Sequence, residues 1–159
     1  MISINIICIG KIKEKYLKDA IEEYSKRLSK YCKLNILELP DEKVPVPLND
    51  SIAKQIKQKE CNLIESYIPE KSFKIALDLN GKQLSSEEFS KKIDEVSLSN
   101  SKITFIIGGT LGFDENFLEK MDYKICFSKM TFPHQLIRVF LLEQLFRSFK
   151  ISNNETYHH

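Results

Sequence analysis

The sequence ITFIIGGTLGF occupies Ile103–Phe113, and YKICFSKMTFPHQLIRVFLLEQLFRSF occupies Tyr123–Phe149. Each stretch begins as a short apolar run that is typical of a buried strand, and each run ends in a loop. The second loop leads directly into the most apolar helix that the sequence predicts. Because open α/β sheets bind ligands in loops at the carboxyl ends of their strands, this part of the chain predicts a binding site.

Apolar runs and helical periodicity alternate along the rest of the chain. The predicted strands are Ile2–Ile9, Leu34–Leu39, Phe73–Leu79 with a closing turn at Asn80-Gly81, Ile103–Ile107 and Tyr123–Phe127. The predicted helices are Glu14–Tyr31, one capped by Asp50 or Ser51, one with a capping box at Ser85 and Glu88, a short one from Asp114, and Gln135–Phe149. This alternation predicts one α/β domain over residues 1–159, with a mostly parallel sheet and helices on both faces.

Composition excludes several classes of protein. The 159 residues are 42% hydrophobic, which is enough for an ordinary core, and no apolar run approaches the roughly 20 residues of a membrane span. Met1 leads straight into a strand pattern without a secretory signal, so we expect a cytoplasmic protein with no membrane partner. The four cysteines form no CxxC pair, so we expect no metal site, and Cys8 and Cys126 are predicted to be small apolar core residues.

Net charge is only +2, but basic residues concentrate near the N-terminus. The segment Gly10–Lys33 holds eight basic and four acidic residues. A solvated helix face explains this distribution, and on charge alone it is the favoured interpretation. The alternative is a surface that faces phosphates.

The last predicted helix is apolar on more than one side. Its large apolar side chains are Leu136, Ile137, Val139, Phe140, Leu141, Leu142, Leu145, Phe146 and Phe149. One face of a sheet does not cover all of them. A second surface is required, and we expect it to be another subunit in a homodimer, with burial inside a single chain as the alternative.

Two loops carry residues that suit a ligand. The glycine turn Gly108–Gly112 follows a strand, and glycines there allow positive φ and close approach of a ligand, although a tight turn alone explains the pattern equally well. It is not GxGxxG, so it is a weak dinucleotide signal. The loop Phe127–His134 combines hydroxyls, backbone amides and apolar walls, which suits a ligand with a polar part and a flat ring.

Arg138 is the unusual residue of the last helix, one turn after His134. A cation among so many apolar neighbours must find an anion or carbonyl groups, or reach the surface. His134, alone at a helix start, is interpreted as a cap or a surface residue.

These motifs resemble a known family. IGGTLGF, SKMTFPHQLIRV and the terminal TYHH, together with INIICIGKIKEKYLKDAIEEY and LPDEK near the start, are similar to the bacterial SPOUT-class 23S rRNA pseudouridine methyltransferases. The resemblance covers essentially the whole chain. It implies a homodimer that methylates N3 of a pseudouridine in 23S rRNA of the large ribosomal subunit or the whole ribosome. It also implies a trefoil knot near the C-terminus, which pattern alone does not predict because true knots are almost absent from proteins.

The resemblance implies S-adenosylmethionine as the methyl donor, without a metal. The implied cofactor-binding residues lie on three loops, at Leu77, at Gly108, and at Phe127, Ser128, Lys129, Met130, Thr131 and Phe132. For catalysis we expect His158 to act as base or proton relay, Arg138 to hold the developing ring anion, and Tyr157 to stack on or hydrogen-bond the base.

Two other functions remain open from the sequence. The first is an α/β enzyme of another class that binds a nucleotide such as ATP or NAD at the glycine turn. The second is a non-catalytic ribosome-associated module that binds RNA without transferring a methyl group.

Overall fold

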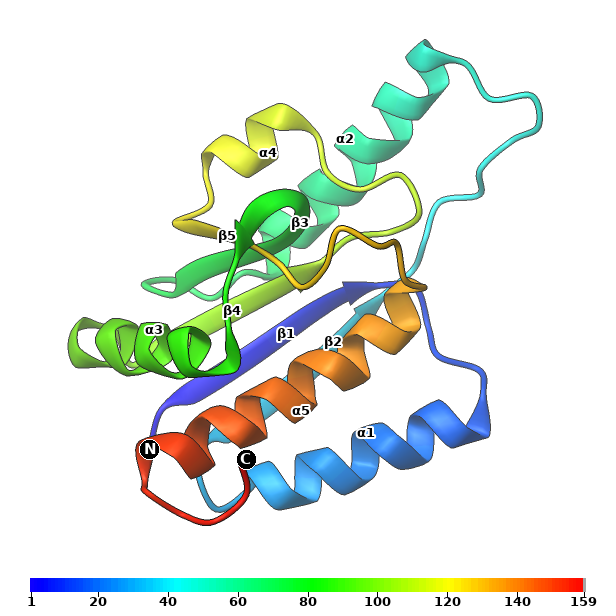
Figure 1. The fold of residues 1–159 in the computed structure, drawn as a ribbon. Coiled ribbons are helices and arrows are strands. Elements are labelled where there is room, and N and C mark those ends of the chain that lie inside the picture. The colour runs from blue at the N-terminus through cyan, green and yellow to red at the C-terminus, as the bar shows by residue number, and fades with distance from the viewer. Residues whose placement is uncertain (159) are drawn as a thin grey trace.

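A computed structural model describes residues 1–158 (Figure 1). Its elements in chain order are β1 (Ser3–Ile9), α1 (Lys15–Leu28), β2 (Lys33–Leu39), α2 (Asp50–Tyr67), β3 (Phe73–Gln83), α3 (Ser86–Ser99), β4 (Lys102–Ile107), α4 (Glu115–Glu119), β5 (Tyr123–Cys126) and α5 (His134–Ser152). The predicted alternation is therefore confirmed, with boundaries that move by a few residues.

The five strands form one sheet in the order β2-β1-β4-β3-β5, and every neighbouring pair is parallel. β1 and β4 lie in its interior, where β-branched side chains pack on both faces. Because all strands run the same way, their carboxyl ends share one edge of the sheet, which is called the carboxyl edge below.

Helices cover both faces of this sheet, as predicted (Figure 1). α1, α3 and α5 pack on one face, against alternate side chains such as Ile6 and Cys8. α2 and α4 pack on the other face, against Ile7 and Ile9. Successive residues of a strand point to opposite faces, so one continuous apolar strand supplies both cores.

The end of β3 differs from the prediction. Asn80-Gly81 does not close the strand, which continues to Gln83. Ile125 pairs with Leu77 and again with Lys82, so the residues between them, 78–81, leave the ladder as an arch. At Gly81 an added Cβ would lie 2.6 Å from the backbone carbon of Ile125. Glycine is required there by the close approach of two backbones, rather than by a turn.

Helix starts agree with the local signals, with one correction. Ser85 and Glu88 form the predicted capping box at the start of α3, and Asp114 caps α4. α2 is capped by Asn49, whose side chain accepts from the backbone nitrogen of Ile52 at 2.9 Å, and not by Asp50 or Ser51.

The apolar surface of α5 is covered largely within the chain. Leu141, Leu142, Leu145 and Phe146 are buried between the sheet, α1 and α3. The second surface required for these four side chains therefore comes from flanking helices, and not from another subunit. Leu136, Val139 and Phe140 stay half-buried, so the homodimer remains a prediction that concerns this part of the helix.

All four cysteines are buried and free of disulfides. Burial raises the pKa of Cys8 to about 12, which keeps the thiol protonated. The interpretation of Cys8 and Cys126 as small core residues is confirmed. Within residues 1–158, no helix combines the length and the apolar character needed to cross a membrane.

Candidate active site

A cavity of about 810 Å³ opens at the carboxyl edge of the sheet. Three segments line it: Leu77–Asn80 in β3, Ile107–Phe113 at the end of β4, and Ile125–Ile137 around the loop that follows β5. In the last segment, Lys129 and Leu136 are not among the lining residues. These segments are far apart in sequence and meet because β4, β3 and β5 are neighbours in a parallel sheet.

Seven of the eight predicted cofactor-binding residues line this cavity. They are Leu77, Gly108, Phe127, Ser128, Met130, Thr131 and Phe132. Lys129 is exposed and is not among the lining residues, since its side chain turns to solvent from the same loop. The structure thus brings the three predicted loops together around one cavity.

The cavity wall is apolar on its sides and polar at its loops. Leu77, Phe113, Phe127 and Phe132 supply hydrophobic surface, while the loops expose backbone amides and hydroxyl groups. Ser128 accepts a hydrogen bond from the backbone nitrogen of Met130 at 3.0 Å, which orders the second loop. Such a lining suits a ligand that has a flat ring at one end and charged groups at the other.

The side chains of Phe113 and Glu60 pack closely against the glycine turn. A Cβ at Gly108 would lie 3.0 Å from the Phe113 ring, and a Cβ at Gly109 would lie 3.0 Å from Glu60 Oε1. Of the three glycines, only Gly112 has a positive φ, of +77°. At Gly108 and Gly109 a side chain would force Phe113 or Glu60 to shift, while Gly112 supplies the positive φ that the sequence predicts for this turn.

Glu60 is a buried carboxyl group beneath this turn, and sequence analysis did not identify it. It lies on α2, is 5% exposed, and accepts from the backbone nitrogen of Glu42 at 3.0 Å. Burial raises the pKa of Glu60, the hydrogen bond from the Glu42 backbone partly opposes this, and the charges of Asp41 and Glu42 raise it further. Through this carboxyl group α2 connects the loop after β2 with the glycine turn.

Arg138 lies just outside the cavity, on the first turns of α5. It is 2% exposed. Its Nη1 donates to Glu38 Oε2 at 2.8 Å, and its Nη2 donates to the carbonyl oxygens of Ile9 and Gly10 at 3.0 and 2.7 Å. The prediction that this cation finds an anion or carbonyl groups is confirmed, since it finds both. The guanidinium joins the ends of β1 and β2 to the start of α5.

His134 is a cavity residue that the sequence analysis misjudged. It lines the cavity, is half-buried, and makes no capping hydrogen bond at the start of α5. Among the described residues, its Nδ1 and Arg138 Nε are the buried side-chain nitrogens without a partner. Burial, followed by the charge of Arg138, lowers the pKa of His134, so the ring is neutral at pH 7. Its position directly after the ligand loop, one turn before Arg138, is the signal that could have revealed it.

Comparisons with known proteins agree with this geometry. The sequence model of a family described as "Predicted SPOUT methyltransferase" matches residues 2–158. A protein of Clostridium perfringens named "Ribosomal RNA large subunit methyltransferase H 1" is 56% identical over 98% of this chain and 99% of its own length. A Clostridium acetobutylicum protein named "Ribosomal RNA large subunit methyltransferase H" is 55% identical over the same shares.

The chain belongs to the SPOUT methyltransferase family. It is therefore a methyltransferase, and a nucleotide-binding enzyme of another class and a non-catalytic module are no longer supported. Solved structures show the same fold at low identity. A probable methylase family protein from Haemophilus influenzae Rd KW20 has a TM-score of 0.58 at 13% identity, and the match covers 98% of this chain and 70% of that one.

This SPOUT methyltransferase does not gather its three predicted catalytic residues at one place. Tyr157 packs edge-on against Phe146 and donates to Glu143. His158 contacts Glu87 through Nε2 at 2.7 Å and Arg147 through Nδ1 at 3.0 Å. The tail folds back, so Tyr157 and His158 lie against the second half of α5, roughly 13–20 Å along the helix axis from His134 at the cavity end. His159 lies outside the described residues.

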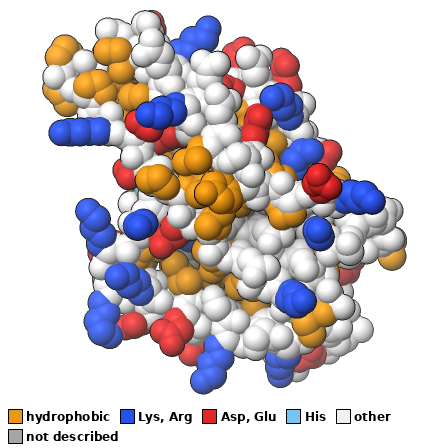
Figure 2. Space-filling view, turned by 180° about the vertical axis from the view of Figure 1, so that it is seen from behind, with side chains coloured by type: hydrophobic (Ala, Val, Ile, Leu, Met, Phe, Trp, Pro, Cys, Tyr) orange, Lys and Arg blue, Asp and Glu red, His pale blue; other side chains and the backbone are white. Residues whose placement is uncertain are grey.

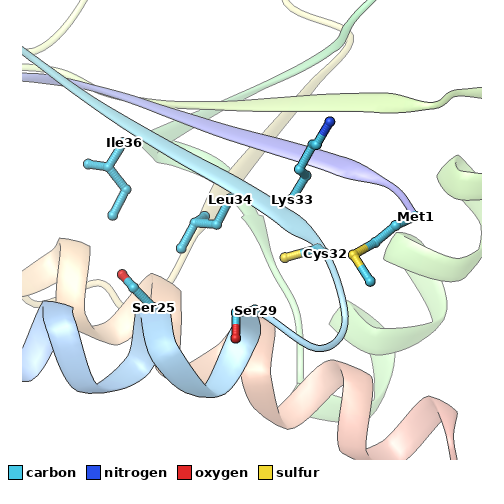
Figure 3. Close-up of a pocket in the computed structure, with 7 residues that line it drawn as sticks. All are labelled: Met1, Ser25, Ser29, Cys32, Lys33, Leu34 and Ile36. Carbon is cyan, nitrogen blue, oxygen red and sulfur yellow. The ribbon is translucent and has the colours of Figure 1, made fainter.

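A second hollow of about 500 Å³ lies between α1 and the edge strand β2 (Figure 3). It is lined by Met1, Ser25, Ser29, Cys32, Lys33, Leu34 and Ile36. The start of β2 forms part of this hollow, so it opens at the amino edge, away from the ligand loops of the SPOUT methyltransferase. Burial raises the pKa of Cys32 to about 11, which leaves the hollow without a reactive thiol.

Proposed function

We propose that this chain transfers the methyl group of S-adenosylmethionine to N3 of a pseudouridine in 23S rRNA of the large ribosomal subunit. The observation that supports it best is the cavity at the carboxyl edge, where seven predicted donor-binding residues meet. The relatives named as methyltransferases of large-subunit ribosomal RNA support the choice of substrate. Such a substrate places the enzyme in the cytoplasm, where ribosomes are assembled.

The residues around the cavity fit this donor. Leu77, Phe127 and Phe132 offer apolar walls for the adenine ring, and the glycine turn offers backbone amides to polar atoms of the ligand. When bound, S-adenosylmethionine supplies an electrophilic methyl group that the ring nitrogen takes by direct displacement, without a covalent enzyme intermediate. Within residues 1–158 there is no cluster of three His, Cys, Asp or Glu side chains arranged to hold a metal.

The protein must remove a proton from N3, because a protonated imide nitrogen is a poor nucleophile. We propose that His158 accepts this proton, because imidazole is the side chain that most often acts as a general base. Arg138 contributes positive charge to the anion that forms on the ring, from a position one turn beyond His134, which lines the cavity. Tyr157 stacks on the target base or donates a hydrogen bond to it.

We further propose that the enzyme works as a homodimer in which the tail of one protomer reaches the cavity of the other. Two observations support this arrangement. Tyr157 and His158 lie against the second half of α5, at Glu143 and Arg147, and do not line the cavity of their own chain. Leu136, Val139 and Phe140 leave apolar surface half-exposed beside that cavity, and a second protomer would cover it.

A trefoil knot is the remaining part of the proposal. The arch 78–81 passes over the end of β5, because Leu77 before the arch and Lys82 after it both pair with Ile125. Figure 1 shows this arch of β3 beside the start of the segment that follows β5. Passage of residues 127–133 through the arch would give the knotted backbone that the family resemblance implies.

Titration calorimetry with S-adenosylmethionine tests donor binding, with ATP and NAD as control ligands. We expect the wild type to bind S-adenosylmethionine and neither control. Gly108→Ala should weaken binding by roughly tenfold, because its Cβ lies 3.0 Å from the Phe113 ring and pushes that ring into the cavity. Lys129→Ala is the matched control on a residue outside the lining, and equal losses in both variants would contradict this placement of the donor.

Mixing two inactive variants tests the shared site. A protein that ends at Asn154 should lose methyl transfer to ribosomes, as should Arg138→Ala. Because each variant keeps the part that the other lacks, a mixture of the two should regain about a quarter of wild-type activity per site if protomers exchange freely. No recovery in a mixture whose subunit exchange is confirmed by mass spectrometry would show that the tail acts within its own chain, while full activity of the truncated protein would remove the tail from the mechanism.

A further inference from the structure

We propose that the segment Lys11–Lys18, which follows β1 and begins α1, is the contact surface for the RNA substrate. Its lysines bind phosphates, and Tyr16 stacks on an unpaired base. The inference rests on the proposed function and adds to it the surface that holds the RNA. It starts from a basic segment for which the donor cavity provides no role.

The segment lies beside the donor cavity. β1 and β4 are parallel neighbours, so the loops that follow them leave the sheet at the same edge. A Cβ at Gly10 would lie 3.1 Å from Cε1 of His134, which lines the cavity. Figure 1 shows the loop between β1 and α1 next to the start of α5. RNA bound on this segment therefore approaches the cavity mouth.

The loop is held in one position by buried contacts. Gly10 donates its backbone N–H to Leu39 and accepts at its carbonyl oxygen from Arg138. The backbone nitrogen of Ile12 donates to Glu38 Oε2 at 2.8 Å, and its side chain is 6% exposed. A loop fixed at two points loses little conformational entropy when it binds a partner.

The side chains beside these anchors point to solvent. Lys11 and Lys13 flank the buried Ile12 and are exposed, and no ion pair involves them within the described chain. Figure 2 shows several Lys and Arg side chains on its lower left flank, the side to which the half turn brings this loop, as well as others elsewhere on that face. Lys18 is exposed as well, while Lys15 pairs with Asp19 at 2.9 Å on the surface.

Tyr16 provides the second kind of contact. It is 71% exposed on the first turn of α1, among the four lysines of the segment. Single-stranded and looped RNA is recognised by stacking of unstacked bases on exposed aromatic rings, together with lysine contacts to phosphate. An exposed aromatic ring among lysines provides both kinds of contact.

Helix stability does not explain these charges. The first turn of α1 contains no acidic residue, and its N-cap residue, Glu14, makes no side-chain capping bond. Lysines near a helix N-terminus oppose the helix dipole. At the other end of α1, Arg27 has a structural role: it pairs with Glu23 at 3.1 Å and lies over the Tyr24 ring. In the segment itself, among contacts within residues 1–158, only Lys15 is paired, with Asp19, so Lys11, Lys13 and Lys18 stay available to bind RNA.

The test measures binding to purified large ribosomal subunits over a series of salt concentrations. Lys11→Gln/Lys13→Gln should bind roughly tenfold more weakly near physiological salt, and the slope of log Kd against log salt should fall by about two, or one per lysine. Tyr16→Ala should also bind roughly tenfold more weakly with the slope unchanged. The KM for subunits should rise in both variants, while kcat at saturating subunits and the Kd for S-adenosylmethionine stay at wild-type values.

Matched controls lie at the amino edge of the sheet. Lys71→Gln/Lys124→Gln removes two exposed lysines near the starts of β3 and β5, and Tyr67→Ala removes a tyrosine that is 51% exposed at the end of α2. If the segment variants bind no more weakly than these controls, the RNA surface lies elsewhere and the inference fails. If the wild type itself neither binds nor methylates the subunits, the proposed function fails instead.

Discussion

Gly81→Ala should destabilise the fold more than any other single methyl addition to the glycines of this chain. The new Cβ would lie 2.6 and 2.7 Å from the backbone carbon and nitrogen of Ile125, and 2.8 Å from the backbone carbon of Lys124. Backbone atoms of a paired strand cannot rotate away as a side chain can, so β3 and β5 must separate. We expect a loss of about 3 kcal/mol or more, which lowers Tm by roughly 6–12 °C in a domain of this size.

The arch also lines the donor cavity, so the same variant should bind S-adenosylmethionine more weakly. Gly112→Ala is the control: a Cβ there meets nothing within 4 Å, and only its φ of +77° opposes the change. That strain costs about 1 kcal/mol. Melting followed by circular dichroism distinguishes the two glycines, and a Tm for Gly81→Ala within about 3 °C of wild type would show that the arch is free to move away from β5.

Arg138→Ala should reduce both stability and methyl transfer. The substitution leaves Glu38 and the carbonyl oxygens of Ile9 and Gly10 without their donor. Removing one member of a buried ion pair costs about 3–5 kcal/mol, and we expect the lower end because the Glu38 side chain is 36% exposed. Methyl transfer should fall by roughly a hundredfold or more if the charge stabilises the ring anion.

Two further variants separate charge from position. Arg138→Lys keeps a positive charge, but an ammonium group does not reproduce the planar fork that reaches three acceptors. Glu38→Gln keeps the charge of Arg138 and an oxygen that accepts from Ile12. If Arg138 serves the ring anion, kcat falls in Arg138→Ala and is largely kept in Glu38→Gln. If Arg138 only holds the loop after β1, KM for ribosomal subunits rises in both variants while kcat at saturation is unchanged, and the anion role is removed.

Local signals were sufficient for the secondary structure. The capping box at Ser85, the cap at Asp114 and the β-branched run of β1 act over a few residues, so each could be predicted from its own segment. The continuation of β3 beyond Asn80-Gly81 could not, since it depends on pairing with Ile125, more than forty residues further along the chain. In this protein the same dipeptide that commonly closes a turn permits two strands to touch.

The candidate site was predictable in its loops but not in its surroundings. Strand order brings Leu77, Gly108 and Phe127 together, and a parallel sheet makes that meeting expected. Glu60 under Gly109 was missed because an acid on a polar helix carries no distinctive pattern. His134 was missed because a histidine at a helix start commonly acts as a cap, although its position after the ligand loop was a signal.

The amino-acid pattern by itself determined an α/β chain with parallel strands, two ligand loops and an apolar last helix that carries one buried cation. These properties depend on the spacing of apolar residues and on turn chemistry, which act locally. Only the tertiary structure decided that Arg138 joins the ends of β1 and β2, that helices of the same chain cover much of α5, and that Tyr157 and His158 lie far from the cavity. The contacts of Arg138 link residues 100 to 129 positions apart, and the free energy of each depends on neighbours that no local pattern identifies.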